Sequence, residues 1–152
     1  EPHEVQQEWF IRQLELAGEV KKPVIIHSRE AAADTMYIMK NYAQGLDGVI
    51  HCYSYSREMA EEYVKMGFYI GIGGVVTFKN AKKLKDVAAA IPIEKIVLET
   101  DCPYMAPEPY RGKRNQSSYI RYVAEKIAEL KEMSQEEVIA VTEKNARDLY
   151  GI

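Results

Sequence analysis

Three short apolar runs in this sequence each end in a side chain that can bind a metal ion. The runs and the residues that follow them are 24–26 with His27, 49–50 with His51, and 96–98 with Glu99, Thr100 and Asp101. Apolar, β-branched runs of this length are typical of strands that are buried on both faces. In a parallel barrel the carboxyl ends of the strands face the active site. Two imidazoles and a carboxylate at such ends therefore predict a site for a divalent metal ion.

Each of these side chains also has a purely structural explanation. A single histidine is more often a hydrogen-bonded core residue, and Asp101 could be a turn carboxylate at the end of a strand. Two histidines at equivalent strand ends, with an aspartate at a third, favour a shared site over three separate structural roles.

The alternation of side chains along a strand adds a fourth residue to this candidate site. Glu99 is expected on the same face as Asp101, one layer deeper, where it could anchor a metal-bound group or a ligand imidazole. By the same rule Cys52 and Cys102 point away from that face, toward the helices. We expect both cysteines to be small buried packing residues and not metal ligands.

Strands and helices are expected to alternate along the chain. The expected helices are 2–20, 30–42, 56–66, 79–89, 116–131 and 135–149, and the expected strands are 24–27, 48–52, 68–73 and 95–101. Ser28 and Ser56 are candidate N-caps, and Ser134 with Glu137 has the spacing of a capping box. A complete (β/α) barrel of TIM type needs roughly 250 residues. The fold class is therefore α/β, with about four strands and half of such a barrel.

The overall composition limits the kind of protein this is. The chain has 152 residues, 47% of them hydrophobic and 28% charged, which fits one globular domain. A net charge of −3 gives no overall attraction to nucleic acid or to an anionic membrane, so a nucleic-acid contact would need a local patch. The apolar runs are too short to cross a bilayer. Two cysteines suggest no disulfide framework, so we expect a cytoplasmic protein with no membrane partner.

Several short motifs occur together and in order along the chain. They are Pro23-Val-Ile-Ile-His-Ser-Arg29, His51-Cys-Tyr-Ser54, Ile72-Gly-Gly74 with Thr77-Phe-Lys-Asn80, and Leu98-Glu-Thr-Asp-Cys-Pro-Tyr104. With these motifs the chain resembles the TatD family of metal-dependent deoxyribonucleases, within the amidohydrolase-like barrel superfamily. The resemblance covers nearly all of the chain and extends to 111–115 and 145–147.

The resemblance implies specific roles for the strand-end residues. His27 and His51 would bind one divalent ion, and Asp101 would bind a second ion and orient or deprotonate the attacking water. The intact site would hold two ions, of Mg, Mn or Zn, which activate water and neutralise charge on a phosphate. The intact protein would then hydrolyse the phosphodiester bonds of DNA.

The long loop at 102–115 carries a basic cluster. The resemblance implies that Arg111, Lys113 and Arg114 hold backbone phosphates, for which an Arg fork and a Lys point charge are suited. On charge alone, an exposed basic turn is an equally good explanation, and the position just after a metal strand favours phosphate. Arg29 is a further phosphate candidate, with a salt bridge to Glu30 or a helix-cap role as its alternatives.

The chain departs from the family pattern in three respects. Tyr55 stands where the family usually has Gly, and Gln116-Ser117 stands where it often has Glu-Pro. The His-x-His pair of the first barrel strand and the metal-bridging Glu of the fourth are missing. We therefore expect residues 1–152 to be the carboxyl-terminal half of the barrel, strands five to eight, with the amino-terminal half absent and three of about six ligands present.

Two other functions fit the same residues. The metal site could activate water against a different ester or an amide, because the basic loop does not exclude carboxylate substrates. Alternatively, the chain is a non-catalytic half-barrel that folds by self-association and binds at most one metal ion weakly.

Overall fold

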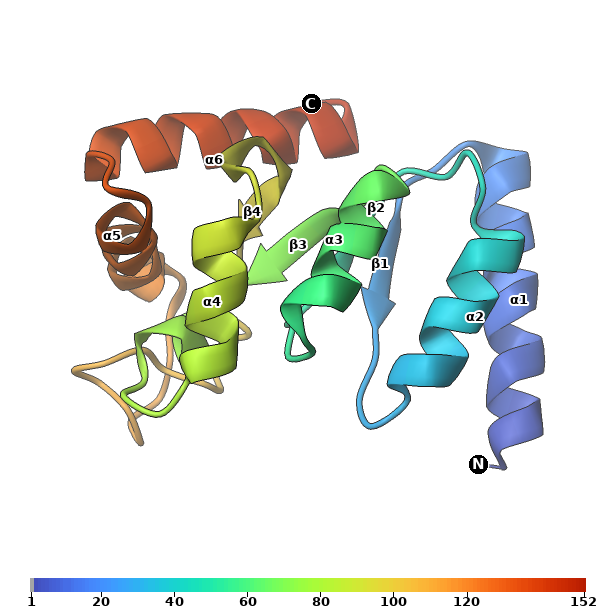
Figure 1. Ribbon diagram of the computed structural model, residues 1–152, viewed down its shortest axis with the longest axis horizontal. Coiled ribbons are helices and arrows are strands. Elements are labelled where there is room, and N and C mark those ends of the chain that lie inside the picture. Colours follow the sequence, from blue (N-terminus) through green and yellow to red (C-terminus); the bar gives the residue numbers. More distant parts are fainter. Residues whose placement is uncertain (1) are drawn as a thin grey trace.

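In the computed structural model, a four-stranded parallel sheet forms the centre of the molecule (Figure 1). The structure describes residues 2–152, so residue 1 of the expected 1–152 unit lies outside the described part. The strands are β1 (Val24–His27), β2 (Gly48–His51), β3 (Tyr69–Ile72) and β4 (Ile96–Leu98). They pair in chain order, β1-β2-β3-β4, with a helix between successive strands. This order is that of a segment of a (β/α) barrel, because a doubly wound sheet reverses its strand order.

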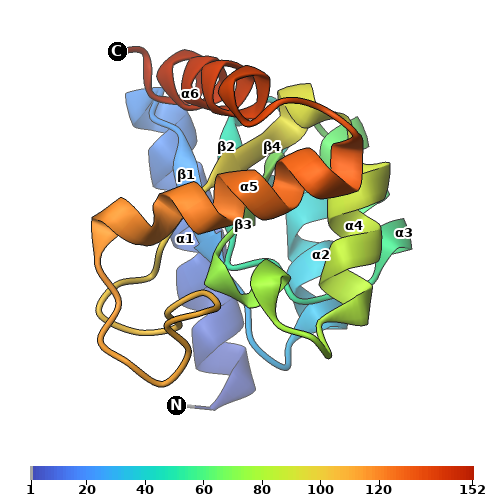
Figure 2. The same ribbon diagram turned by 90° about the vertical axis from the view of Figure 1, so that its left-hand side faces the viewer.

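Six α-helices surround the sheet. They are α1 (His3–Val20), α2 (Ala32–Tyr42), α3 (Arg57–Lys65), α4 (Lys82–Ala90), α5 (Ile120–Lys131) and α6 (Gln135–Tyr150), with short 3-10 helices η1 (Gly74–Thr77), η2 (Ile93–Lys95) and η3 (Ser117–Tyr119). Figure 1 shows α6 at the amino-terminal ends of the strands, and the β4–α5 loop at their carboxyl ends. Figure 2 shows α5 crossing in front of the sheet below α6. Within residues 2–152, every helix is too short or too polar to cross a membrane.

The strand register separates a helix-facing side of the sheet from the opposite side. One register row, Ile26, Ile50, Ile70 and Ile96, is buried in the main core among the helices. On the opposite face, Val49 and Val97 pack against Leu149 of α6. Helix α6 does not cover β1 in the same way. Ile25 on β1 is 61% exposed, although it is in register with the buried Val49 on β2. The β1 side of the sheet is thus open.

Side-chain amides and hydroxyls fix several of these elements. The amide of Asn145, on α6, donates to the carbonyl oxygens of Ile93 and Ile96 at 2.8 Å each, which attaches α6 to the start of β4. Ser56 caps α3, and Ser134 with Glu137 forms a capping box at α6, as predicted. Such caps contribute roughly 1 kcal/mol each because they satisfy amides that lack a helical partner.

Other expected details were wrong. The Ser28 hydroxyl does not cap α2, which begins after Ala31 without a side-chain cap, and lies instead 2.7 Å from Thr35 Oγ1 and 2.8 Å from Tyr55 Oη. The helix expected from residue 79 begins at Lys82, because residues 78–81 form a turn in which the Ala81 N–H donates to the Phe78 carbonyl oxygen. The strand expected over 95–101 ends at Leu98, so Asp101 lies in the loop that follows.

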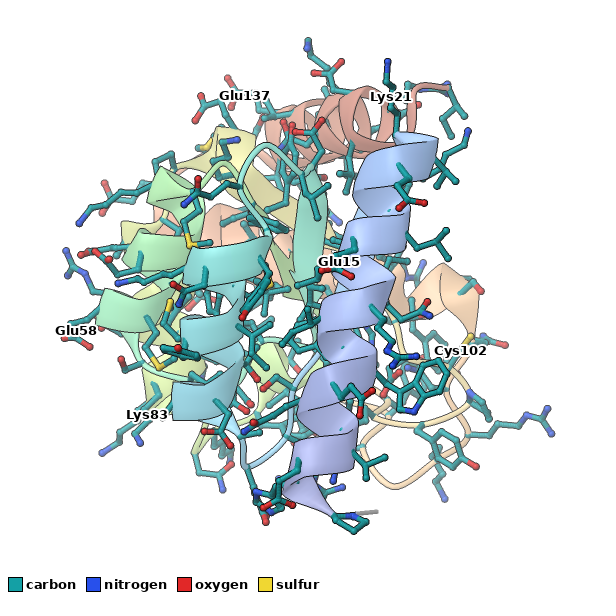
Figure 3. All side chains as sticks on the ribbon, turned by 90° about the vertical axis from the view of Figure 1, so that its right-hand side faces the viewer. Glu15, Lys21, Glu58, Lys83, Cys102 and Glu137 are labelled. Carbon is teal, nitrogen blue, oxygen red and sulfur yellow. The ribbon has the colours of Figure 1, made fainter. Side chains whose placement is uncertain are left out.

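The open side of the sheet carries a hollow of about 1170 Å³ between α1 and β1, with both apolar and polar residues in its lining. Its lining includes Trp9, Val20 and Ile25, which are 56%, 51% and 61% exposed. Figure 3 views the molecule from this side, with α1 across the front and Glu15 and Lys21 along it. We propose that two copies of the chain associate through this surface, because an open parallel edge and an apolar patch both favour pairing.

We expect this chain to be a dimer in solution, and Ile25→Lys to convert it to a monomer, because a lysine on the edge strand blocks pairing. The measurement is molar mass by light scattering after size exclusion. Ile139→Lys is the matched control, since Ile139 lies on α6 and is 44% exposed. A monomeric wild-type chain, or equal effects of the two variants, would contradict the proposal.

Candidate metal centre

The two strand-end histidines lie side by side at the carboxyl edge of the sheet. His27 ends β1 and His51 ends β2, and the two residues are register partners. Their ring centroids are 5.9 Å apart, with an angle of 40° between the ring planes. His27 is exposed and His51 is partly buried. The parallel register therefore brings together two imidazoles that are distant in the sequence.

Asp101 faces the same pair from the loop after β4. Its Oδ1 lies 3.5 Å from Nε2 of His51. The residue has φ = +55°, in the left-handed region, and its carbonyl oxygen accepts a hydrogen bond of 2.9 Å from the Tyr104 amide. Strained backbone of this kind persists where surrounding contacts determine it. The turn conformation, and not strand alternation, thus directs Asp101 toward His51.

Glu99 holds His51 from the side opposite Asp101. Nδ1 of His51 donates to Glu99 Oε2 at 2.7 Å, and the backbone N–H of Cys52 donates to Glu99 Oε1 at 2.7 Å. In a neutral His51 whose Nδ1 donates to Glu99, the lone pair is on Nε2, the nitrogen that faces Asp101. This geometry is the arrangement expected of a carboxylate that orients an imidazole ligand.

Glu99 reaches His51 by crossing β3, which lies between β2 and β4 in the sheet. The crossing passes over Gly71, where an added Cβ would lie 2.5 Å from Glu99 Oε2. Any side chain at this position would displace the carboxylate. The sequence analysis missed this position, although a glycine inside a strand is a known signal of close approach by another group.

Burial shifts the proton affinities at this end of the sheet. Loss of solvent raises the pKa of Glu99, and the His51 imidazole and the Cys52 amide oppose this effect. Burial, followed by the charge of Glu99, raises the pKa of Cys52 to about 11, so its thiol is protonated at neutral pH. Cys52 itself has φ = +48°, which places its amide against Glu99.

Asn115 fixes the segment that carries Asp101. It is 3% exposed, and its side-chain amide donates to the carbonyl oxygens of Thr100 and Tyr104 at 2.6 and 2.7 Å. Its backbone N–H donates to the carbonyl oxygen of Pro103 at 2.9 Å. Nothing in the sequence spacing identified this role, because the partners are 11 to 15 residues away and lie in a loop.

The two cysteines differ in environment. Cys52 is partly buried, whereas Cys102 is exposed, and Figure 3 shows Cys102 at the outside of the β4–α5 loop. The expectation that Cys102 is a buried packing residue was wrong, because β4 ends before it and alternation no longer sets its direction.

The basic candidates all lie on exposed loops. Arg111 stacks on the ring of Phe78 at 4.2 Å, which ties the β4–α5 loop to the segment after η1. Arg29 lies on the β1–α2 loop, two residues after His27 and far from the other three in the sequence. A salt bridge to Glu30, one of the two alternatives for Arg29, does not form. Within residues 2–152, no carboxylate pairs with any of the four cations: Arg29, Arg111, Lys113 and Arg114.

The donor types at this edge fit a divalent ion, but the ligand set is incomplete. Among residues 2–152, no three His, Cys, Asp or Glu side chains form a group that could hold a metal ion on its own. Nε2 of His51 and Oδ1 of Asp101 converge, and the ring of His27 lies beside them. A metal ion here would need ligands in addition to His27, His51 and Asp101, whose roles as ligands stay predictions.

Comparison with known proteins establishes the family. A family profile described as TatD related DNase matches residues 1–151. The chain belongs to the TatD family. The crystal structure of the TatD homologue YjjV of Escherichia coli K12 matches it with a TM-score of 0.91 and 31% identity, over 98% of this chain and 57% of that chain. This match confirms the α/β fold class of the TIM barrel type.

Other TatD-like relatives are more similar in sequence. The chain is 50% identical to YabD of Bacillus subtilis over 152 residues, which are 99% of this chain and 60% of that protein. It is 44% identical to YcfH of Escherichia coli K12 over 148 residues, which are 97% of this chain and 56% of that protein. Both relatives carry the name uncharacterized metal-dependent hydrolase. The chain thus spans a little more than half the length of these relatives.

We expect Gly71→Ala to release His51 from Glu99, because the new methyl group takes the place of the carboxylate. Nitrogen-15 NMR should show His51 as the Nδ1–H tautomer in the parent chain and as a mixture in the variant. Gly18→Ala is the control, since its Cβ would make only an ordinary contact of 3.5 Å with Leu46. An unchanged His51 tautomer in Gly71→Ala would show that Glu99 does not orient the ring.

Proposed function

We propose that the protein carrying this chain is a metal-dependent hydrolase that cleaves phosphodiester bonds of DNA in the cytoplasm. The observation that carries the proposal is the convergence of His51 Nε2 and Asp101 Oδ1 at 3.5 Å, with His51 Nδ1 held by Glu99. This arrangement places one imidazole nitrogen and one carboxylate side by side at the edge of the sheet, as ligands of two adjacent ions would be. Relatives named metal-dependent hydrolases support the metal, and the DNase family description supports the substrate.

In this proposal His27 and His51 hold one divalent ion, and Asp101 contributes to a second. Both ions would be of Mg, Mn or Zn, with the remaining ligands supplied from outside residues 2–152. Bound there, the ions would lower the pKa of a water molecule and neutralise charge on the phosphate. The chain's own contribution is to fix the ligands, and the Glu99 bridge does so for His51 before any ion arrives.

Asp101 is the candidate for proton transfer. Its side chain is 40% exposed, so water and substrate can reach it, whereas the side chain of Glu99 is only 16% exposed. The carboxylate of Asp101 would orient the attacking water and accept its proton. The Asn115 contacts would keep Asp101 in position while this happens.

Four cations are proposed to bind the phosphates on either side of the cleaved bond: Arg111, Lys113, Arg114 and Arg29. All four are exposed, and none has a carboxylate partner among the described residues. Exposed cations without partners suit a substrate that is a chain of negative charges. Stacking on Phe78 restricts Arg111 and presents its guanidinium at the surface.

A hydrolase of another ester or an amide is the second candidate, because the relatives' names do not specify the bond. The unpaired cations favour a phosphodiester, and a panel of substrates would separate the two. A non-catalytic role for this chain alone is compatible with the incomplete ligand set.

We expect Asp101→Asn, made in the whole protein that carries this chain, to reduce DNA cleavage by about 10²-fold or more while leaving the fold intact. The amide can neither accept the water proton nor neutralise the charge of an ion. Asp86→Asn on the exposed surface of α4 is the matched control and should cleave normally. Cleavage is measured on a labelled oligonucleotide with added Mg²⁺ or Mn²⁺. Undiminished cleavage by Asp101→Asn would end the assignment.

We also expect the double variant Arg111→Ala, Arg114→Ala to bind DNA more weakly and to flatten the salt dependence by about 1.5 in log–log slope, because two phosphate contacts are lost. The loss of the Phe78 stack should cost about 0.5–1 kcal/mol of stability. Arg147→Ala is the control, because Arg147 is paired with Glu143 on α6. An unchanged salt slope would leave the loop as an exposed basic turn.

A further inference from the structure

A second cavity lies beside Asp101 at the carboxyl edge of the sheet, on the side of η1 and α4. Its volume is about 410 Å³, within the range of roughly 300–1,000 Å³ that is typical of small-molecule sites. Its lining includes Asp101 and Glu99, and also Lys82 and Lys83 from the start of α4. The cavity therefore adjoins the proposed reaction centre.

The walls of the cavity are mainly apolar. Side chains of Val75 and Leu84 contribute from η1 and α4, and Met105 contributes from the β4–α5 loop. Gly73 and Gly74 form the part of the wall next to β3, where the β4–α5 loop packs so closely that a Cβ on Gly74 would lie 2.2 Å from the Met105 carbonyl oxygen. A flat or apolar group would be held here better than a phosphate.

The cavity has few polar side chains, and those of Ser54, Asn80, Lys82 and Lys83 have no hydrogen-bond or ion-pair partner within residues 2–152. The side chains of Ser54 and Asn80 line it and make no hydrogen bond within residues 2–152. Lys82 and Lys83 are exposed and have no carboxylate partner in that part of the chain. One hydroxyl and one amide can pair with the edge of a heteroaromatic ring, and two cations can meet a phosphate beyond it.

We propose that this cavity receives the nucleobase of the nucleotide next to the cleaved phosphate, a subsite that rests on the function proposed above. The apolar walls would contact the two faces of the base, and Ser54 and Asn80 would bond its edge. The attached phosphate would then lie at the Asp101 end, and the following phosphate near Lys82 and Lys83. Bases drawn out of a stack are commonly held in this way, between apolar side chains and a few hydrogen-bonding groups.

Met105 supplies a direct probe, because its methyl group would lie against the aromatic ring. The test uses this chain with carbon-13-labelled methionine methyl groups, in EDTA so that no metal contributes. The ligands are 2′-deoxyadenosine 5′-monophosphate and 2-deoxyribose 5-phosphate, each to about 10 mM, which is roughly tenfold above a millimolar Kd. We expect the nucleotide to shift the Met105 signal and the sugar phosphate to leave it in place. Met36 on α2 and Met133 before α6 are internal controls.

Two variants test the contacts. Asn80→Ala should weaken the nucleotide-dependent shift severalfold without affecting the fold, because Asn80 is exposed, and Asn41→Ala on the exposed face of α2 is its matched control. Val75→Trp should fill the cavity and abolish the shift, with circular dichroism as the check on folding. Retention of the full shift in both folded variants would overturn the proposal.

The outcomes separate this subsite from the proposed function. Equal shifts with both ligands would reveal a phosphate site and overturn the nucleobase assignment, as would no shift with either. If the whole protein cleaves DNA while Met105 does not respond, the subsite is wrong and the DNase function stands. If Met105 responds to the nucleotide while DNA is not cleaved, the subsite is supported and the DNase function is wrong.

Discussion

The carboxylate of Glu99 joins the ends of two strands that are not neighbours. From the end of β4 it crosses β3 and binds both the imidazole of His51 and the amide of Cys52, at 2.7 Å each. This crossing depends on Gly71, the one place on β3 where the side chain must be absent. The direction of His51 depends on this bridge, whereas Asp101 approaches His51 from the loop after β4. The candidate centre is therefore a property of three strands together and not of the histidines alone.

Sequence reasoning succeeded where the hydrophobic pattern and parallel strand pairing determine the structure. Apolar runs located the four strands, and parallel pairing placed His27 beside His51 and Glu99 on their face. It failed where the cause was a contact between distant segments. The left-handed turn at Asp101 depends on Asn115 and on the Tyr104 amide, and neither contact has a signature in residue spacing. The exposure of Cys102 follows from the same turn.

The two sides of the candidate centre differ in how completely they are built. On the β2–β4 side, Glu99 holds His51 and Asn115 holds the segment that carries Asp101. The cavity lined by α4 adjoins Asp101 on this side. On the β1 side, His27 is exposed and Ile25 below it has no cover among the described residues. The chain spans 60% of YabD and 56% of YcfH. Activity should therefore be measured on the whole protein that carries this chain.

The sequence separation across the Glu99 bridge has a consequence for the order of folding. His51 and Glu99 are 48 residues apart, and closing such a loop is slow relative to forming the local β1–β2 pair. An intermediate with only β1 to β3 would already present both imidazoles, but with neither carboxylate nor a fixed tautomer. The capacity to bind a metal ion in a defined geometry would thus arrive with the last strand.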